Sequence, residues 1–104
     1  MQIQINSENN IKIGQEHIDR FKEVISAALD RYSDQITRVE AHLSDENSNK
    51  KGPDDKRCLL EARLEGLQPV AASNIASTLE LAVSGAAEKL KQSLASIKGR
   101  LRNY

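Results

Sequence analysis

Residues 36–65 read ITRVEAHLSDENSNKKGPDDKRCLLEARLE, and both ends of this stretch alternate between apolar and polar side chains. Successive side chains of a strand point to opposite faces of a sheet, so this period of two predicts two strands that each have one buried face. The inward residues would be Val39, Ala41 and Leu43 in residues 36–44, and Cys58, Leu60, Ala62 and Leu64 in residues 57–65. Strands that share a core in this way predict an adjacent antiparallel pair, with residues 45–56 as a long polar loop between them.

Two amphipathic helices are predicted on either side of this pair. In residues 15–32 and again after residue 77, apolar residues recur at spacings of three and four, which is the period of one helix face. The Ser77 hydroxyl and the Glu80 carboxylate fit a capping box at the start of the second helix. Gly85 lies inside that helix at a cost of about 1 kcal/mol relative to Ala, which close packing against the sheet would explain. The two stripes are Ile18, Phe21, Ile25, Ala28, Leu29 and Tyr32, then Leu79, Val83, Ala86, Leu90, Leu94, Ile97 and Leu101.

Two shorter strands complete the prediction. Residues 1–6 alternate, with Ile3 and Ile5 on one face, and a short strand near residues 70–73 follows Pro69, a residue typical of an edge or a strand start. The order is β-α-β-β-β-α, an α+β class, as one domain over residues 1–104. Both helices would cover one face of a four-stranded sheet. The open face would carry the polar strand residues Arg38, Glu40, His42, Arg57, Glu61 and Arg63.

The composition favours a cytosolic protein. The chain has 104 residues, which suits one domain with one core. It contains no apolar run near the roughly 18 residues that span a bilayer, and residues 1–20 have no apolar stretch typical of a signal peptide. We therefore expect a cytoplasmic location and no membrane partner.

The loop at residues 45–56 resembles the start of a calcium-binding loop. Asp45, Asn47 and Asn49 have the required spacing, but Lys50 stands where the sharp turn needs Gly, and Lys56 stands where the closing Glu belongs. An ammonium group in place of a bidentate carboxylate removes the ligand that closes the site, so we expect no calcium.

Other chemistry also lacks the residues that it needs. A zinc site needs three or four ligands, whereas His42 and Cys58 supply two and are predicted on opposite faces of the sheet. The same geometry argues against a Cys–His nucleophile, so Cys58 is interpreted as a small buried core residue. The five glycines form no phosphate-binding pattern. We expect no catalytic residue, no metal, no cofactor and no small-molecule substrate.

The net charge of zero hides an asymmetry at the C-terminal end. Residues 86–104 hold five Lys/Arg and one Glu. On a helical wheel Lys91, Lys98 and Arg102 lie on one flank of the apolar stripe, and Lys89 and Arg100 lie on the other. Cations near a helix C-terminus stabilise it through the macrodipole, and two such rows also fit a phosphate backbone. The residues alone leave both interpretations open.

Four segments together resemble one known family. They are MQIQINSENN at the start, DRYSDQITRVEAHLSDEN, DKRCLLEARLEGLQPV and PVAASNIASTLELAVSGAAEKLKQSL. Their order and their positions over nearly the whole chain resemble the ribosome hibernation promoting factor family, also called ribosome-associated inhibitor A or sigma-54 modulation proteins.

The resemblance implies a fold like that of double-stranded-RNA-binding domains. It also implies docking on the rRNA of the small ribosomal subunit, with ribosomal proteins as a further contact, where the chain would block the channel for mRNA and the A- and P-site tRNAs. The residues expected to contact rRNA are Lys22, Lys89, Lys91, Lys98, Arg100 and Arg102.

The sequence departs from the family at the last helix. Short family members carry basic residues at the positions of Lys89, Gln92 and Ser96, and only Lys89 is basic here. An alternative is therefore a regulatory protein-interaction module with the same fold and with weak or no rRNA binding. The additional C-terminal domain of long members is not expected, so pairing of ribosomes would need another factor. In the loop, Lys50 and Lys51 are the residues expected to touch rRNA or a ribosomal protein, if it has a role.

Overall fold

The computed structural model describes residues 1–8, 11–45 and 56–101, with residues 98–101 described as helical backbone only. The predicted order β-α-β-β-β-α is confirmed, with a 3-10 turn (Asp30–Tyr32) after the first helix. The elements are β1 (Gln2–Ser7), α1 (Gln15–Leu29), β2 (Ile36–Asp45), β3 (Lys56–Leu64), β4 (Val70–Ala76) and α2 (Leu79–Leu101).

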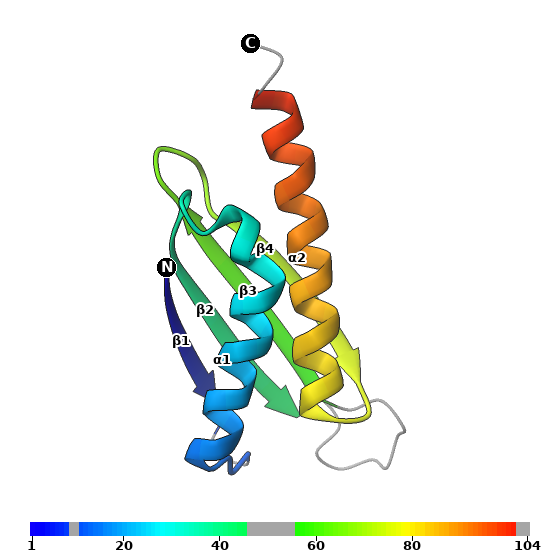
Figure 1. The fold of residues 1–104 in the computed structure, drawn as a ribbon. Coiled ribbons are helices and arrows are strands. Elements are labelled where there is room, and N and C mark those ends of the chain that lie inside the picture. Colours follow the sequence, from blue (N-terminus) through cyan, green and yellow to red (C-terminus); the bar gives the residue numbers. More distant parts are fainter. Residues whose placement is uncertain (9–10, 46–55, 102–104) are drawn as a thin grey trace.

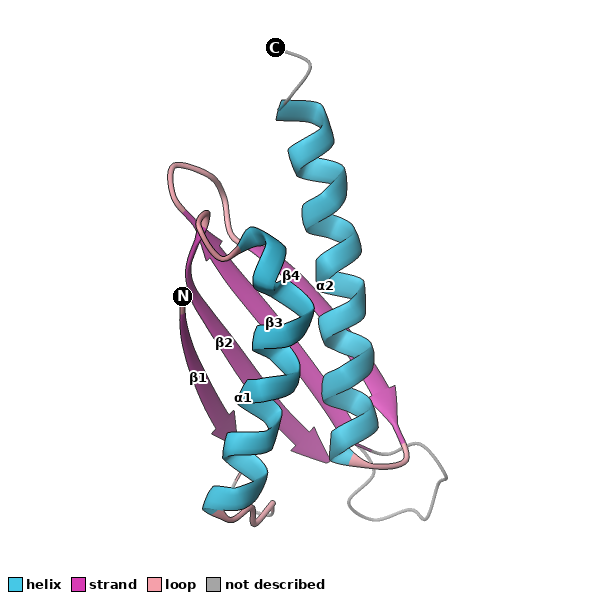
Figure 2. Ribbon diagram, in the orientation of Figure 1, coloured by secondary structure: helices cyan, strands magenta, loops and turns pink. Residues whose placement is uncertain are grey.

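The four strands form one mixed sheet in the order β1-β2-β3-β4. The crossover through α1 makes β1 parallel to β2, while the other two pairs are antiparallel. The register places Leu43 beside Cys58 and Val39 beside Ala62, so the inward residues of the two central strands meet. Both helices lie on one face of the sheet and leave the other face open, as Figures 1 and 2 show.

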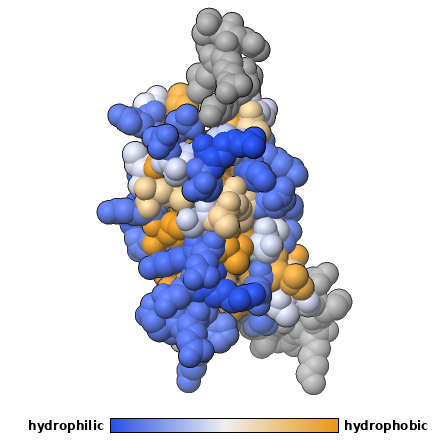
Figure 3. All heavy atoms as spheres, in the orientation of Figure 1, coloured by the Kyte–Doolittle hydropathy of each residue, from blue (hydrophilic) through white to orange (hydrophobic). Residues whose placement is uncertain are grey.

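The core lies between the sheet and the two helices. All seven inward residues predicted for β2 and β3 are buried there. From α1 the core receives Phe21, Ile25 and Leu29, and Tyr32 follows in the 3-10 turn. Ala82 and Ala87 of α2 are also buried, although the predicted stripe omitted them, because a helix packed against both a sheet and a second helix buries more than one row. Figure 3 shows the helix side as mostly hydrophilic, with small separate hydrophobic areas.

Two predictions about β4 and α2 need correction. The fourth strand continues to Ala76 instead of ending near residue 73, because β3 begins at Lys56 and pairs with β4 to that point. The cap of α2 is Thr78 and not Ser77: its Oγ1 accepts a hydrogen bond from the Leu81 N–H at 3.1 Å.

Glu80 does not close a capping box either. Its Oε1 lies 2.6 Å from a guanidinium nitrogen of Arg20 on α1, so this carboxylate links the two helices. Both side chains are more than half exposed, and the pair therefore contributes little to stability.

Gly85 lies where α2 crosses β4 closely. A Cβ placed on Gly85 would lie 2.6 Å from Cγ of Asn74 on β4, and closer still to its Nδ2. Asn74 Nδ2 in turn donates a long hydrogen bond of 3.4 Å to the Leu81 carbonyl. The expectation that close packing against the sheet explains this glycine is confirmed.

Candidate nucleic-acid interface

Helix α2 carries most of the predicted rRNA-binding residues. It has 23 residues, which corresponds to a length of about 34 Å. Its N-terminal part packs on β3, β4 and α1, while its last turns project past the sheet (Figure 1). The backbone positions of Lys98 and Arg100 belong to these projecting turns; their side chains and all of Arg102 lie outside the described residues.

Lys89 and Lys91 lie one turn or more before the projecting end. The Lys89 side chain is exposed and its Nζ donates a hydrogen bond of 3.2 Å to the Ser73 carbonyl of β4. Lys91 is half-buried, on the opposite flank of the helix because two residues correspond to a rotation of about 200°. Of the predicted row formed by Lys89 and Arg100, the described side chain of Lys89 therefore lies at the β4 edge of the sheet.

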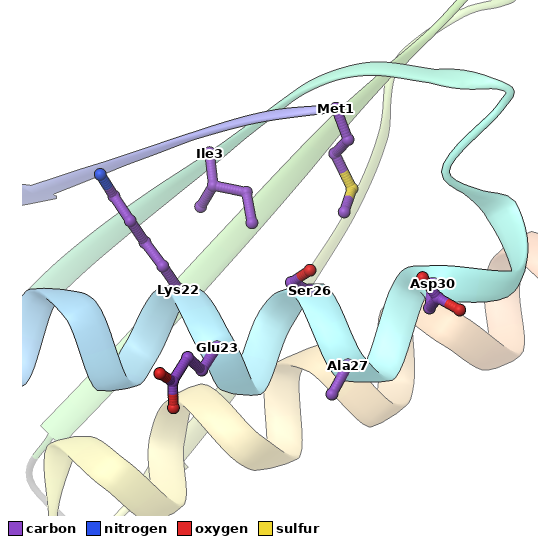
Figure 4. A pocket seen from close by; sticks show the side chains of 7 residues that line it. All are labelled: Met1, Ile3, Lys22, Glu23, Ser26, Ala27 and Asp30. Carbon is purple, nitrogen blue, oxygen red and sulfur yellow. The ribbon is translucent and has the colours of Figure 1, made fainter.

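Lys22 lies in a different region of the surface. It extends from α1 toward β1 and lines a groove with Met1 and Ile3 (Figure 4). Since β1 and β4 form opposite edges of the sheet, Lys22 and Lys89 are on opposite sides of the domain. The structure therefore does not bring Lys22 into one continuous patch with Lys89.

A second group of basic side chains surrounds the start of both helices. Lys12, His17 and Lys56 line a hollow of about 420 Å³ together with Thr78 and Leu79 at the first turn of α2. Lys56 also forms an ion pair with Asp45, in which the Lys56 Nζ lies 3.4 Å from the Asp45 Oδ2. These residues come from three separate segments, so the sequence pattern carried no signal that they would meet.

This second group lies at the opposite end of the domain from the projecting turns of α2 (Figure 1). The segment that contains Asn47, Asn49, Lys50 and Lys51 lies outside the described residues, so its predicted contacts stay untested.

His42 and Cys58 point to opposite faces of the sheet, as predicted. His42 is exposed on the open face, where its Nε2 lies 3.5 Å from an oxygen of Glu40, while Cys58 has no exposed surface. Within residues 1–8, 11–45 and 56–101, no group of three His, Cys, Asp or Glu side chains is arranged to hold a metal ion.

The Cys58 thiol is a poor nucleophile in this environment. Burial raises its pKa from 9.0 to about 12, and the positive charge of Arg57 opposes this only in part. The reactive form of cysteine is the thiolate, so the thiol stays protonated and inert at neutral pH. The interpretation of Cys58 as a core residue is confirmed.

The sequence profile of one family covers almost the whole chain. The family described as sigma 54 modulation protein / S30EA ribosomal protein matches residues 3–102. The chain belongs to this family. The resemblance stated from the sequence is therefore confirmed, and the family is one of ribosome-associated factors. Comparison with curated protein sequences gives no match.

Two solved structures have the fold of this S30EA family member. The N-terminal domain of Protein Y from Thermus thermophilus superposes with a TM-score of 0.73 at 22% identity, covering 93% of this chain and 99% of that one. A ribosomal subunit interface protein from Coxiella burnetii gives a TM-score of 0.70 at 18% identity, covering 95% and 99%. At these identities the likeness supports the fold, which agrees with the α+β prediction.

Among the helices in the described part of this family member, none has the length and apolar character required to cross a membrane.

Proposed function

We propose that this protein binds the small ribosomal subunit through rRNA and suppresses translation by occupying the channel for mRNA and the A- and P-site tRNAs. Membership of the S30EA family supports ribosome association. The observation that carries the proposal is the long helix α2, whose most basic turns project beyond the sheet where a phosphate backbone can reach them from several sides. Such a protein acts in the cytoplasm, where ribosomes are.

The cations of α2 would position the domain on the rRNA backbone. Phosphate contacts fix the register and orientation of a protein, while shape supplies much of the selectivity for folded RNA. Lys98, Arg100 and Arg102 would supply charge at the projecting end. Lys89 can join them, because an ammonium group has three donors and the bond to the Ser73 carbonyl uses one.

Inhibition in this scheme is steric and needs no covalent chemistry. A domain seated in the decoding channel excludes mRNA and tRNA as long as it stays bound. The buried Cys58 thiol, with a pKa of about 12, fits such a role because it takes no part in the surface that meets the RNA. Neither a cofactor nor a substrate is required.

The test is co-sedimentation with small subunits and whole ribosomes at low salt. The paired substitution Lys91→Glu with Lys98→Glu reverses two charges on one flank of α2, and binding should be lost. Arg63→Glu is the matched control, because Arg63 is exposed on the open face of the sheet and lies away from α2. High salt should release the native protein, since bound cations displace counterions from the phosphates.

A protein-interaction module with weak or no rRNA affinity is the alternative. The net charge of zero and the position of Lys22 away from Lys89 favour it. The same experiment separates the two functions. Ribosome binding that survives the charge reversal on α2, or no association with ribosomes at low salt, contradicts the rRNA proposal.

A further inference from the structure

The two edges of the sheet differ in how they are protected. On β4, Lys89 crosses the edge and binds the Ser73 carbonyl, which is a common way to keep a strand from pairing with another chain. On β1 the sequence QIQINS has no charged residue and no proline. Among the described elements, β2 alone pairs with β1, so the other side of this strand offers free backbone donors and acceptors.

A groove runs beside this free edge, between β1 and α1. It has a volume of about 770 Å³ and is open to solvent. Met1, just before β1, and Ile3 form its apolar side (Figure 4). Lys22 and Ser26 of α1 and Asp30 of the 3-10 turn lie across from them, while Glu23 and Ala27 also border the groove but point away from β1 (Figure 4). Met1 is 38% exposed and Ile3 is half-buried, so apolar surface remains uncovered there.

The groove has opposite charges at its two ends. Lys22 and Ser26 of α1 and Asp30 of the 3-10 turn that continues it follow one another at spacings of four residues, so the Cα atoms of Lys22 and Asp30 are separated by about 12 Å along the helix axis. Within the described parts of the chain, neither side chain makes a hydrogen bond or an ion pair. The apolar residues and Ser26 lie between them (Figure 4).

We infer that the groove binds an extended peptide segment of another protein, which adds to the sheet beside β1. Strand addition takes its affinity from main-chain hydrogen bonds and its specificity from pockets for alternate side chains. Four residues of an extended strand span about 13 Å, close to the separation of the Lys22 and Asp30 Cα atoms along the helix axis. The segment therefore carries an acidic residue, an apolar residue and a basic residue at alternate positions, against Lys22, Met1 and Ile3, and Asp30. The acidic residue of the segment can precede or follow its basic residue, because the segment can run in either direction beside β1.

A second copy of this chain fits the same edge less well. Full antiparallel pairing of two β1 strands places the two-fold axis near Gln4 at the centre of the strand. Lys22 extends toward β1 beside Ile3 (Figure 4), so the two ammonium groups would face each other near this axis. Like charges in that position repel, whereas a peptide acid in the same place is attracted.

The test is an NMR titration of the whole protein with the acetylated and amidated peptide TETITKT, whose Glu, Ile and Lys alternate as required. Backbone amide shifts should be confined to β1 and the groove face of α1. The peptides TQTITQT and TETSTKT, which lack the charges or the apolar side chain, should bind more weakly. Lys22→Glu should weaken binding of TETITKT roughly five- to tenfold, and the Arg63→Glu control should leave it unchanged.

A charge exchange protects this test from a folding artefact. Lys22→Glu combined with Asp30→Lys restores one charge of each sign to the groove, so TETITKT should bind again in the reverse direction. No shifts at millimolar peptide, shifts outside the groove, or equal binding of the uncharged peptide would each overturn the inference. So would a concentration-dependent dimer, seen by light scattering, that protects the β1 amides from exchange, because a second copy would then be the occupant.

Discussion

Gly85→Ala should destabilise this protein, although the same change stabilises most helices. In a helix interior, Ala is favoured over Gly by about 1 kcal/mol. Here the new Cβ would lie 2.6 Å from Cγ of Asn74, so the Asn74 side chain must leave its place and give up its hydrogen bond to the Leu81 carbonyl. Overpacking of this kind costs about 1–3 kcal/mol. The net result should be a loss of about 1 kcal/mol in the free energy of unfolding, or about 4–8 °C in Tm.

The measurement is urea unfolding followed by circular dichroism at 222 nm, for four proteins in a double-mutant cycle. Asn74→Ala removes the obstacle, and in that background Gly85→Ala should stabilise the protein by about 1 kcal/mol. The two changes should therefore be coupled by about 2 kcal/mol. A higher stability of Gly85→Ala in the native background, or additive effects in the cycle, would refute the close contact between α2 and β4.

Three further predictions concern rRNA binding, the cap of α2 and the buried thiol. Lys91→Gln with Lys98→Gln should reduce the slope of log K against log salt by about 1.5 in binding assays at 50–200 mM KCl; an unchanged slope would mean that neither side chain contacts phosphate. Thr78→Ala should cost about 1 kcal/mol in urea unfolding, whereas Ser77→Ala should change stability by less than about 0.5 kcal/mol. A larger loss of stability for Ser77→Ala than for Thr78→Ala would mean that Ser77 caps α2, as the sequence predicted. Cys58 should not react with Ellman's reagent at pH 8 unless the protein is unfolded. Because the folded pKa of about 12 exceeds the unfolded value of 9.0, the stability that Cys58 contributes should be complete below pH 9 and lost as the pH rises toward 12. The Cys58→Ala variant lacks the thiol and should not show this loss. An equal pH dependence of the free energy of unfolding in the two proteins would contradict the prediction.

Local patterns predicted the elements of this fold well because each element buries one face. The alternation in residues 36–44 and 57–65 identified seven of the eight core residues of β2 and β3. It missed Ile36, because the register of β2 shifts between Ile36 and Arg38 and the period of two is interrupted there. The stripe of α1 identified Phe21, Ile25 and Leu29 in the same way. Strand and helix periods differ, so a buried face leaves a distinct spacing in the sequence before any tertiary contact is known.

The ends of helices and strands and the partners of polar side chains were harder to predict, because they depend on contacts between elements. Ser77 and Thr78 are both good capping residues, and only the path of the chain from β4 decides which hydroxyl meets the Leu81 N–H. Glu80 had a plausible local role, but the packing of α1 beside α2 brought Arg20 within reach of it. The strand after Pro69 is longer than its own pattern suggested, since the length of β3 sets how far pairing continues.

The candidate nucleic-acid interface also combines features of one segment, which the sequence predicts, with features that depend on contacts between elements. The sequence alone determined that charge gathers at the end of the last helix, because that property belongs to one continuous segment. Only the tertiary structure decided which cations are neighbours. The order β1-β2-β3-β4 separates Lys22 from Lys89, and the fold places Lys12 and His17 around the same hollow as Lys56 of β3. A period within one element fixes which face a side chain occupies, whereas its distance to a side chain on another element depends on strand order and helix placement.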